Sequence, residues 1–154
     1  EGHGFNIPVL RNDVIISKRQ LLEARLFGAS AVQLDADFLS FEEYSELLDY
    51  AHNIGLEVVV AIRNANQLNY AQTAADIVAV VNYNLDDFTA DVQRSLQLVA
   101  QLPKDKVLLA EGGVRTADEI RKLKSAGYHG VLLGNCLMSQ ADPAAALQQL
   151  RSEL

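Results

Sequence analysis

The chain has 154 residues, of which 49% are hydrophobic and 21% are charged, and its formal net charge is −7. This composition predicts one compact domain over residues 1–154, and the acidity argues against a nucleic-acid or membrane-surface partner. The single cysteine, Cys136, excludes a disulfide framework and a cysteine-based metal cluster, and it suits a cytoplasmic protein. No apolar run reaches the roughly 18 residues of a membrane span. We expect no metal or cofactor.

Short apolar runs of strand length alternate along the chain with segments of helical periodicity. The predicted strands are Pro8–Leu10, Ala31–Leu34, Glu57–Ile62, Ile77–Asn82, Val107–Ala110 and Gly130–Leu133. The predicted helices are Lys18–Phe27, Phe41–Ile54, Ala65–Ala74, Asp91–Ala100, Ala117–Ala126 and Ala144–Leu150. Continuous apolar strands that alternate with helices are typical of a parallel α/β sheet.

Residue types at the helix ends support these boundaries. Ser40 with Glu43, and Thr116 with Glu119, have the spacing of a capping box at a helix start. Three predicted helices are followed by a glycine at the position that favours a left-handed backbone, namely Gly28, Gly55 and Gly127. Six βα units fit either an open doubly wound sheet or part of a (β/α)8 barrel, which takes about 250 residues when complete. Periodicity alone does not distinguish these two folds.

Two glycine-containing segments follow the last two predicted strands. Glu111 ends the fifth strand and is followed by Gly112 and Gly113, while Gly134 and Asn135 follow the sixth strand. Such glycines either serve only as turn residues or let backbone N–H groups approach an anionic ligand. Loops after the last two strands of a barrel commonly bind phosphate, so for this pair of segments we favour a site for a phosphorylated small molecule.

Several multi-residue motifs resemble the indole-3-glycerol-phosphate synthase family of tryptophan biosynthesis. They are, in chain order, "PVLRND", "GLEVVVAIRN", "VVNYNL", "AEGGV" and "LLGNCLM". The resemblance covers nearly the whole chain, and it implies a partial (β/α)8 TIM barrel of about six parallel βα units. These units are the third to the eighth, so the first two strands are lacking. The implied activity is that of a carbon–carbon lyase, which closes the indole ring of a sugar phosphate derivative.

The resemblance also implies that most catalytic groups have been replaced. The family's third-strand lysine, a general acid, falls on Asn12, and its fifth-strand glutamate falls on Ala61. A neutral amide has no proton to donate at pH 7, and alanine has no functional group. The seventh-strand glutamate is kept as Glu111, but its serine partner is Gly112. We therefore expect phosphate binding with little or no native activity, because losing one such group typically costs two to four decades in rate.

The end of the fourth predicted strand, which matches the sixth strand of the family, carries two further candidate binding residues. The family's asparagine and arginine fall on Val81 and Tyr83, whereas Asn82 remains in the match. Tyr83 either donates a hydrogen bond into the barrel mouth or fills the space of the arginine. Asn82 is expected to contact the substrate.

Asp35 and Asp37, at the end of the second predicted strand, suggest a different chemistry. Paired carboxylates bind Mg²⁺ or divide acid and base roles, and strand ends converge in a barrel. Asp35 or Asp37 could therefore share a pocket with Asn12 and Glu111 in a lyase or isomerase for another sugar phosphate. Alternatively, one aspartate caps a turn and the other is solvated.

The remaining polar residues are assigned structural or surface roles. Arg11 and Asp13 are expected to form an ion pair near the first strand end, and Cys136 is expected to be a small buried residue. Three histidines without ligand spacing are expected at the surface or in turns, namely His3, His52 and His129.

Six strands of an eight-stranded barrel leave two open sheet edges, which invite pairing. We therefore expect a homo-oligomer that associates through these edges. A second functional hypothesis follows, in which the chain is a non-catalytic, self-assembling or engineered partial-barrel module.

Overall fold

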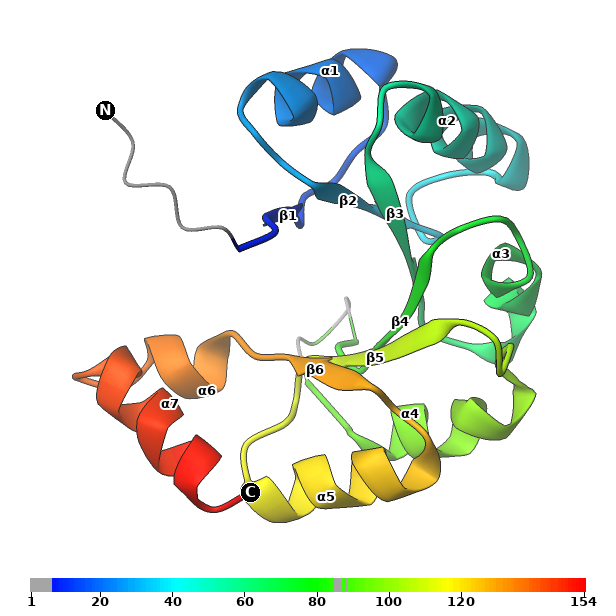
Figure 1. The fold of residues 1–154 in the computed structure, drawn as a ribbon. Helices are drawn as coiled ribbons and strands as arrows, with labels where there is room; N and C mark the ends of the chain where they lie inside the picture. The colour runs from blue at the N-terminus through cyan, green and yellow to red at the C-terminus, as the bar shows by residue number, and fades with distance from the viewer. Residues whose placement is uncertain (1–6, 85–86, 88) are drawn as a thin grey trace.

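The computed structural model describes residues 7–84, 87 and 89–154, and it has six parallel strands in one curled sheet with helices on the outer side (Figure 1). The sheet order follows the chain order, from β1 to β6. The strands are β1 (Leu10–Arg11), β2 (Ala31–Asp35), β3 (Glu57–Ile62), β4 (Ile77–Val81), β5 (Val107–Glu111) and β6 (Gly130–Leu132). This arrangement confirms a partial TIM-barrel fold rather than a doubly wound sheet, because every strand pairs with its neighbour in sequence.

The connections between successive strands contain the helices, and two helical segments follow β6. The α-helices are α1 (Lys18–Leu26), α2 (Phe41–Asn53), α3 (Leu68–Ala71), α4 (Gln93–Leu98), α5 (Ala117–Ala126), α6 (Asn135–Met138) and α7 (Pro143–Ser152). Two 3₁₀ turns adjoin α3 and α4, namely η1 (Ala65–Gln67) and η2 (Val99–Gln101).

The third and fourth helices differ most from the prediction. Asn64 accepts a hydrogen bond from the Asn66 amide (3.0 Å), so its segment begins as η1 and only one turn of α-helix follows. Asp91 likewise accepts from the Gln93 amide (2.9 Å), which delays α4 by two residues. Asparagine and aspartate side chains compete in this way for backbone donors that a helix would use.

Local capping signals agree with the prediction in detail. Both capping boxes form, with Ser40 and Thr116 each accepting from the amide of the glutamate three residues later. The three glycines after helices all have positive φ, at 86° for Gly28, 77° for Gly55 and 115° for Gly127.

The strands alternate their side chains between two buried layers. One set packs between the sheet and the helices, namely Val32, Leu34, Val58, Val60, Ile62, Val78, Val80, Leu108 and Ala110. The alternate set faces the concave side of the sheet and includes Val59, Ala61, Ala79 and Val81, each at most 3% exposed. The curl of the sheet therefore buries a barrel-like interior at its middle strands, although β1 and β6 do not pair with each other.

The two flanks of the sheet are less well covered. On the β1 flank, Leu26 is 82% exposed and Phe27 is 89% exposed, and on the β6 flank Met138 is 74% exposed. No residue of α7 is buried. In the described part of the chain, none of the helices is long and apolar enough to cross a membrane.

Candidate functional site

Glu111, at the end of β5, is the centre of a hydrogen-bond network at the carboxyl ends of the strands. Its Oε1 accepts from Asn12 Nδ2 after β1 (2.9 Å), and its Oε2 accepts from Gln33 Nε2 on β2 (2.9 Å). The curl of the sheet brings these residues together although Asn12 and Glu111 lie 99 positions apart. Both partners are neutral amides, so the Glu111 carboxylate is bound without a cation on it.

A second network joins β2 to the end of β3. Arg63 donates from both terminal nitrogens to Asp35, at 2.6 and 2.8 Å, and its Nη1 lies 3.0 Å from Asp37 Oδ2. Asp37 also accepts from Gln67, and Asp35 accepts from the Asp37 amide (2.9 Å). Burial alone lowers the pKa of Arg63, but the Asp35 hydrogen bonds and the charges of Asp35, Asp37 and Glu111 raise it on balance. The aspartates are thus bound to one guanidinium and are not a free carboxylate pair.

These two networks line a central cavity of about 590 Å³. Asn12, Asp35 and Glu111 face it together, as the convergence of strand ends predicts, but Asp37 does not line it. Its polar lining also includes Asp13, Gln33, Arg63 and Asn135, and its apolar lining includes Val14, Phe38, Val81, Leu132 and Leu133.

Asn82 occupies a structural position. It is 1% exposed, its Nδ2 donates to the Gly112 carbonyl (2.8 Å), and its Oδ1 accepts from the Ser95 amide and hydroxyl. It lines none of the cavities at the strand ends, and its hydrogen bonds tie β4 to α4 and to the glycine loop. A contact between Asn82 and the substrate stays a prediction.

A second cavity, of about 480 Å³, lies at the glycine loops. Gly112 and Gly113 have φ values of 78° and 75°, which L-residues rarely adopt, and both line the cavity together with Gly134. Within the described residues, the amides of Gly113 and Gly134 have no hydrogen-bond acceptor. Arg115 also lines the cavity and makes no ion pair in that part of the chain.

Tyr83 lines both the central cavity and the glycine-loop cavity. Its ring packs on the backbone of Gly112, where a Cβ atom would overlap ring carbons. Tyr83 therefore fills space at the glycine loop.

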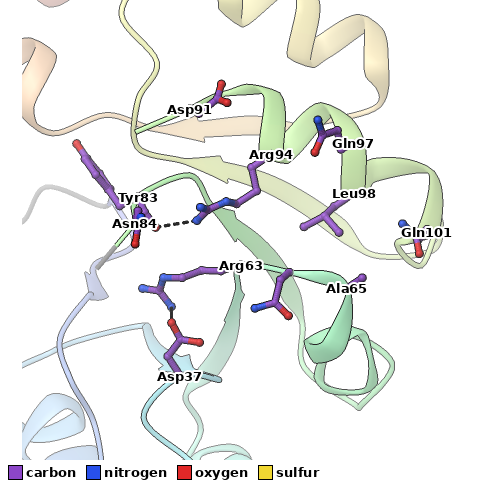
Figure 2. Close-up of a pocket in the computed structure, with 11 residues that line it drawn as sticks. Asp37, Arg63, Ala65, Tyr83, Asn84, Asp91, Arg94, Gln97, Leu98 and Gln101 are labelled. Carbon is purple, nitrogen blue, oxygen red and sulfur yellow. Dashed lines mark hydrogen bonds and ion pairs between the residues drawn. The ribbon is translucent and has the colours of Figure 1, made fainter. Parts of the chain in front are cut away.

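A third and wider cavity, of about 790 Å³, runs from the end of β3 to α4 (Figure 2). Arg63 and Asp37 lie on one side of it, and Arg94 lies on the other. Arg94 donates to the carbonyls of Val81 (3.2 Å) and Tyr83 (2.8 Å) and so fixes the end of β4.

The minor predictions have mixed outcomes. Arg11 and Asp13 form the expected ion pair at 3.0 Å, which lowers the pKa of Asp13 together with a hydrogen bond from the Val14 amide. Cys136 was expected to be buried, which is wrong. It is only partly buried because it lines the glycine-loop cavity, on a helix, α6, that has no buried residue.

The two described histidines, His52 and His129, each contact a neighbouring segment of the chain. His52 Nε2 lies 2.9 Å from Asp76 Oδ2, and the exposed His129 accepts from the Leu108 amide (3.0 Å). His3 lies outside the described residues, as does Leu85 at the end of "VVNYNL". Within the described ranges, no group of three or more His, Cys, Asp or Glu side chains could hold a metal ion.

Arg63 and Gln33 were not identified from the sequence as site residues. Arg63 binds Asp35 and Asp37, and Gln33 binds Glu111, at the carboxyl ends of the strands. Gln33 lies two positions before Asp35 in a continuous apolar run, and strand periodicity puts both on one face. That spacing was a usable signal for an inward-facing glutamine. Arg63 directly follows the apolar strand "EVVVAI", where strand ends converge, and this was a usable signal as well.

Comparisons with known proteins agree with this architecture. The model of the indole-3-glycerol phosphate synthase family matches residues 3–150. The chain belongs to this family. It is 38% identical to the indole-3-glycerol phosphate synthase of Bacteroides thetaiotaomicron over 143 residues, which are 93% of this chain and 55% of that protein. It is 39% identical to that of Campylobacter concisus over 145 residues, or 94% and 56% of the two chains. The chain thus spans about half the length of the curated relatives it matches.

Solved structures of low sequence identity share the fold. The 3-hexulose-6-phosphate synthase of Salmonella typhimurium aligns with a TM-score of 0.77 and 16% identity over 96% of this chain and 72% of that chain. A chain of a designed, cube-shaped protein cage aligns with a TM-score of 0.66 and 20% identity, over 92% and 52%. At these identities the likeness concerns the TIM-barrel-like fold alone.

Proposed function

We propose that this chain binds a phosphorylated small molecule at the glycine loops and has little or no indole-forming activity. The observation that carries the proposal is the glycine-loop cavity, where Gly112 and Gly113 have positive φ and the Gly113 and Gly134 amides lack acceptors among the described residues. Backbone N–H groups gathered around a concave site bind phosphate oxygens without needing net positive charge. The Arg115 side chain adds a cation at the same cavity.

The central cavity supports the second half of the proposal. Asn12 donates to Glu111 but has no proton to transfer at pH 7, and Ala61 is fully buried on the concave side of the sheet. Arg63 binds the carboxylates of Asp35 and Asp37, which the alternative lyase or isomerase would use. The geometry therefore favours binding over turnover at either set of residues.

Phosphate binding is tested by calorimetric titration of the chain with inorganic phosphate, followed by a Gly113→Ala variant. A Cβ at residue 113 would lie 3.1 Å from the Ala90 side chain and in a strained backbone, so we expect binding to weaken about tenfold or more. Gly28→Ala is the matched control, because it has a similar φ of 86° with nothing within 4 Å of its Cβ. Unchanged affinity in Gly113→Ala, or no binding by the unmodified chain, would contradict the assignment.

Turnover is tested separately with the anilino-deoxyribulose phosphate substrate of the family. We expect a rate below about one thousandth of that of a full-length relative, because at least two catalytic groups are absent. A rate near that of the relative would refute the loss of activity while leaving the phosphate site intact.

We also propose that the open flanks associate with a second copy of the chain. Leu26 and Phe27 on one flank and Met138 on the other are more than 70% exposed, and β1 and β6 each have one unpaired edge. Sedimentation at micromolar concentration should detect a dimer or larger species. A stable monomer over that range would contradict this proposal.

A further inference from the structure

The central cavity differs in charge from the glycine-loop cavity beside it. Its lining contains three carboxylates, Asp13, Asp35 and Glu111, and one guanidinium, Arg63, which gives a formal charge of −2. Asp13 and Asp35 each have an arginine partner, whereas Glu111 forms no ion pair among the described residues. A carboxylate placed in this cavity would be repelled by the net negative charge of the lining, and most directly by Glu111.

The hydrogen bonds around Glu111 also favour a ligand that donates hydrogen bonds. A carboxylate only accepts hydrogen bonds, so Asn12 and Gln33 must both turn their NH₂ groups toward Glu111. The Gln33 carbonyl oxygen then faces away from Glu111. Gln33 is 3% exposed, and its Oε1 is buried without a hydrogen-bond partner among the described residues. A buried, unpaired acceptor is unfavourable, and the partner that would satisfy it is a donor.

The two cavities adjoin, so one small ligand can occupy both. Tyr83, Gly112, Leu132, Gly134 and Asn135 line both of them. Gln33 and Glu111 lie side by side in the lining of the central cavity, because the Gln33 amide nitrogen is 2.9 Å from Glu111 Oε2. The acceptors at this point are thus one neutral oxygen and one charged carboxylate.

We propose that the ligand of this chain carries a hydroxyl-rich or protonated amine group, and no carboxylate, in the central cavity next to Glu111 and Gln33. This inference rests on the proposed phosphate binding at the glycine loops. It defines the ligand class as a small phosphorylated polyol or amino sugar, whereas the substrate of the indole-forming reaction carries a carboxylate. The cavity thus favours a ligand that donates hydrogen bonds to it and that carries no negative charge at this end.

The test is a calorimetric titration of the full chain with a matched series of probes. Inorganic phosphate, glucitol 6-phosphate, glucosamine 6-phosphate and 6-phosphogluconate share the phosphate and differ in the group offered to the cavity. We expect glucosamine 6-phosphate to bind tightest and glucitol 6-phosphate next. We expect 6-phosphogluconate to bind at least about tenfold more weakly than glucitol 6-phosphate, because of its carboxylate.

Two variants and one control test whether Glu111 and Gln33 cause the preference among these probes. Glu111→Gln should remove the preference for glucosamine 6-phosphate over glucitol 6-phosphate, measured as the ratio of the two affinities in the same variant. Glu57→Gln is the matched control, because it removes the same charge at the opposite end of the strands and should change nothing. Gln33→Leu should weaken both probes toward the affinity of inorganic phosphate.

The possible failures are distinguishable. If inorganic phosphate binds but 6-phosphogluconate binds as tightly as glucitol 6-phosphate, the inference is wrong and the phosphate site stands. If none of the probes binds, including inorganic phosphate, both the proposed function and this inference are wrong. The probe series uses the unmodified chain, so this decision does not depend on whether a variant folds.

Discussion

The three middle strands, β2 to β4, and the two flanks of this sheet differ strongly in burial. In β2 to β4, all but two residues, Glu57 and Ile77, are buried, and α2, between β2 and β3, contributes Tyr44, Leu47 and Leu48 to the core. In β1 and β6 every residue is only partly buried, and α7 has no buried residue.

This difference shows that burial in a barrel depends on having a βα neighbour on both sides. Leu26 and Phe27 lie at the end of α1 and are exposed, and among the described residues no βα unit precedes β1 to cover them. The hydrophobic free energy that holds the chain together therefore comes mainly from the middle strands. Changes in the middle should alter global stability, and changes on the flanks should not.

Arg63→Ala should have the largest effect. It would leave Asp35, 8% exposed, as a buried charge without its partner, which typically costs about 3–5 kcal/mol. Urea unfolding measures the change in the free energy of unfolding. Arg121→Ala is the matched control, because Arg121 and Asp118 are exposed, and such pairs contribute at most about 1 kcal/mol. Equal losses in the two variants would contradict the importance of the buried ion pair.

The next effect is a loss of stability at alkaline pH. Burial raises the pKa of Tyr44 and Tyr128 to about 12, although each phenol also makes a hydrogen bond. The unfolded chain releases these protons near pH 10, so their contribution is complete below about pH 10 and is lost between pH 10 and 12. Each tyrosine should account for about 2–3 kcal/mol.

Chemical unfolding from pH 8 to 12 measures this loss. Tyr44→Phe and Tyr128→Phe should each flatten the decline above pH 10, whatever they cost at pH 8. A decline that is the same in both variants as in the unmodified chain would show that these phenols do not cause it.

Helix caps provide a smaller and more direct comparison of middle and flank. Ser40 caps α2 in the middle and Asp142 caps α7 on the flank, each through a side-chain oxygen. Ser40→Ala should lower the global free energy of unfolding by about 1 kcal/mol. Asp142→Ala should leave it nearly unchanged and instead speed hydrogen exchange within α7. Similar global losses in the two variants would mean that α7 unfolds together with the middle.

The smallest effect on stability is expected for Phe27→Ser. The side chain is 89% exposed, so the free energy of unfolding should change by no more than about 0.5 kcal/mol. If the flank associates with a second copy, the same substitution should weaken association in sedimentation experiments. Unchanged association would mean that the contact does not use the β1 flank.

Most of the fold could be predicted because its signals are local. Strand Glu57–Ile62 and helix Ala117–Ala126 were predicted to the residue, since a continuous apolar run and a capping box each define their own boundaries. β1 begins two residues later and ends one residue later than predicted, and as an edge strand with one partner it has only two paired residues. α6 was missed because a single helical turn has no periodicity to detect.

The candidate site was predictable only in part. The convergence of parallel strand ends suggested that Asp35 or Asp37 could share a pocket with Asn12 and Glu111, and Asn12, Asp35 and Glu111 line one cavity. That Arg63 would bind both Asp35 and Asp37 could not be derived, because it depends on the side-chain orientations at two neighbouring strand ends. The sequence shows the two carboxylates, but it does not show which cationic side chain binds them.

The contact between Tyr83 and Gly112 restricts the order in which these two positions can change during evolution. The family motif has a serine at the position of Gly112 and an arginine at that of Tyr83. Any side chain at residue 112 would collide with the Tyr83 ring, so the tyrosine in this position requires glycine at 112 beforehand. Reversion of Gly112 alone is blocked for the same reason. The two positions should therefore covary among relatives, with tyrosine in this place only where the loop residue is glycine.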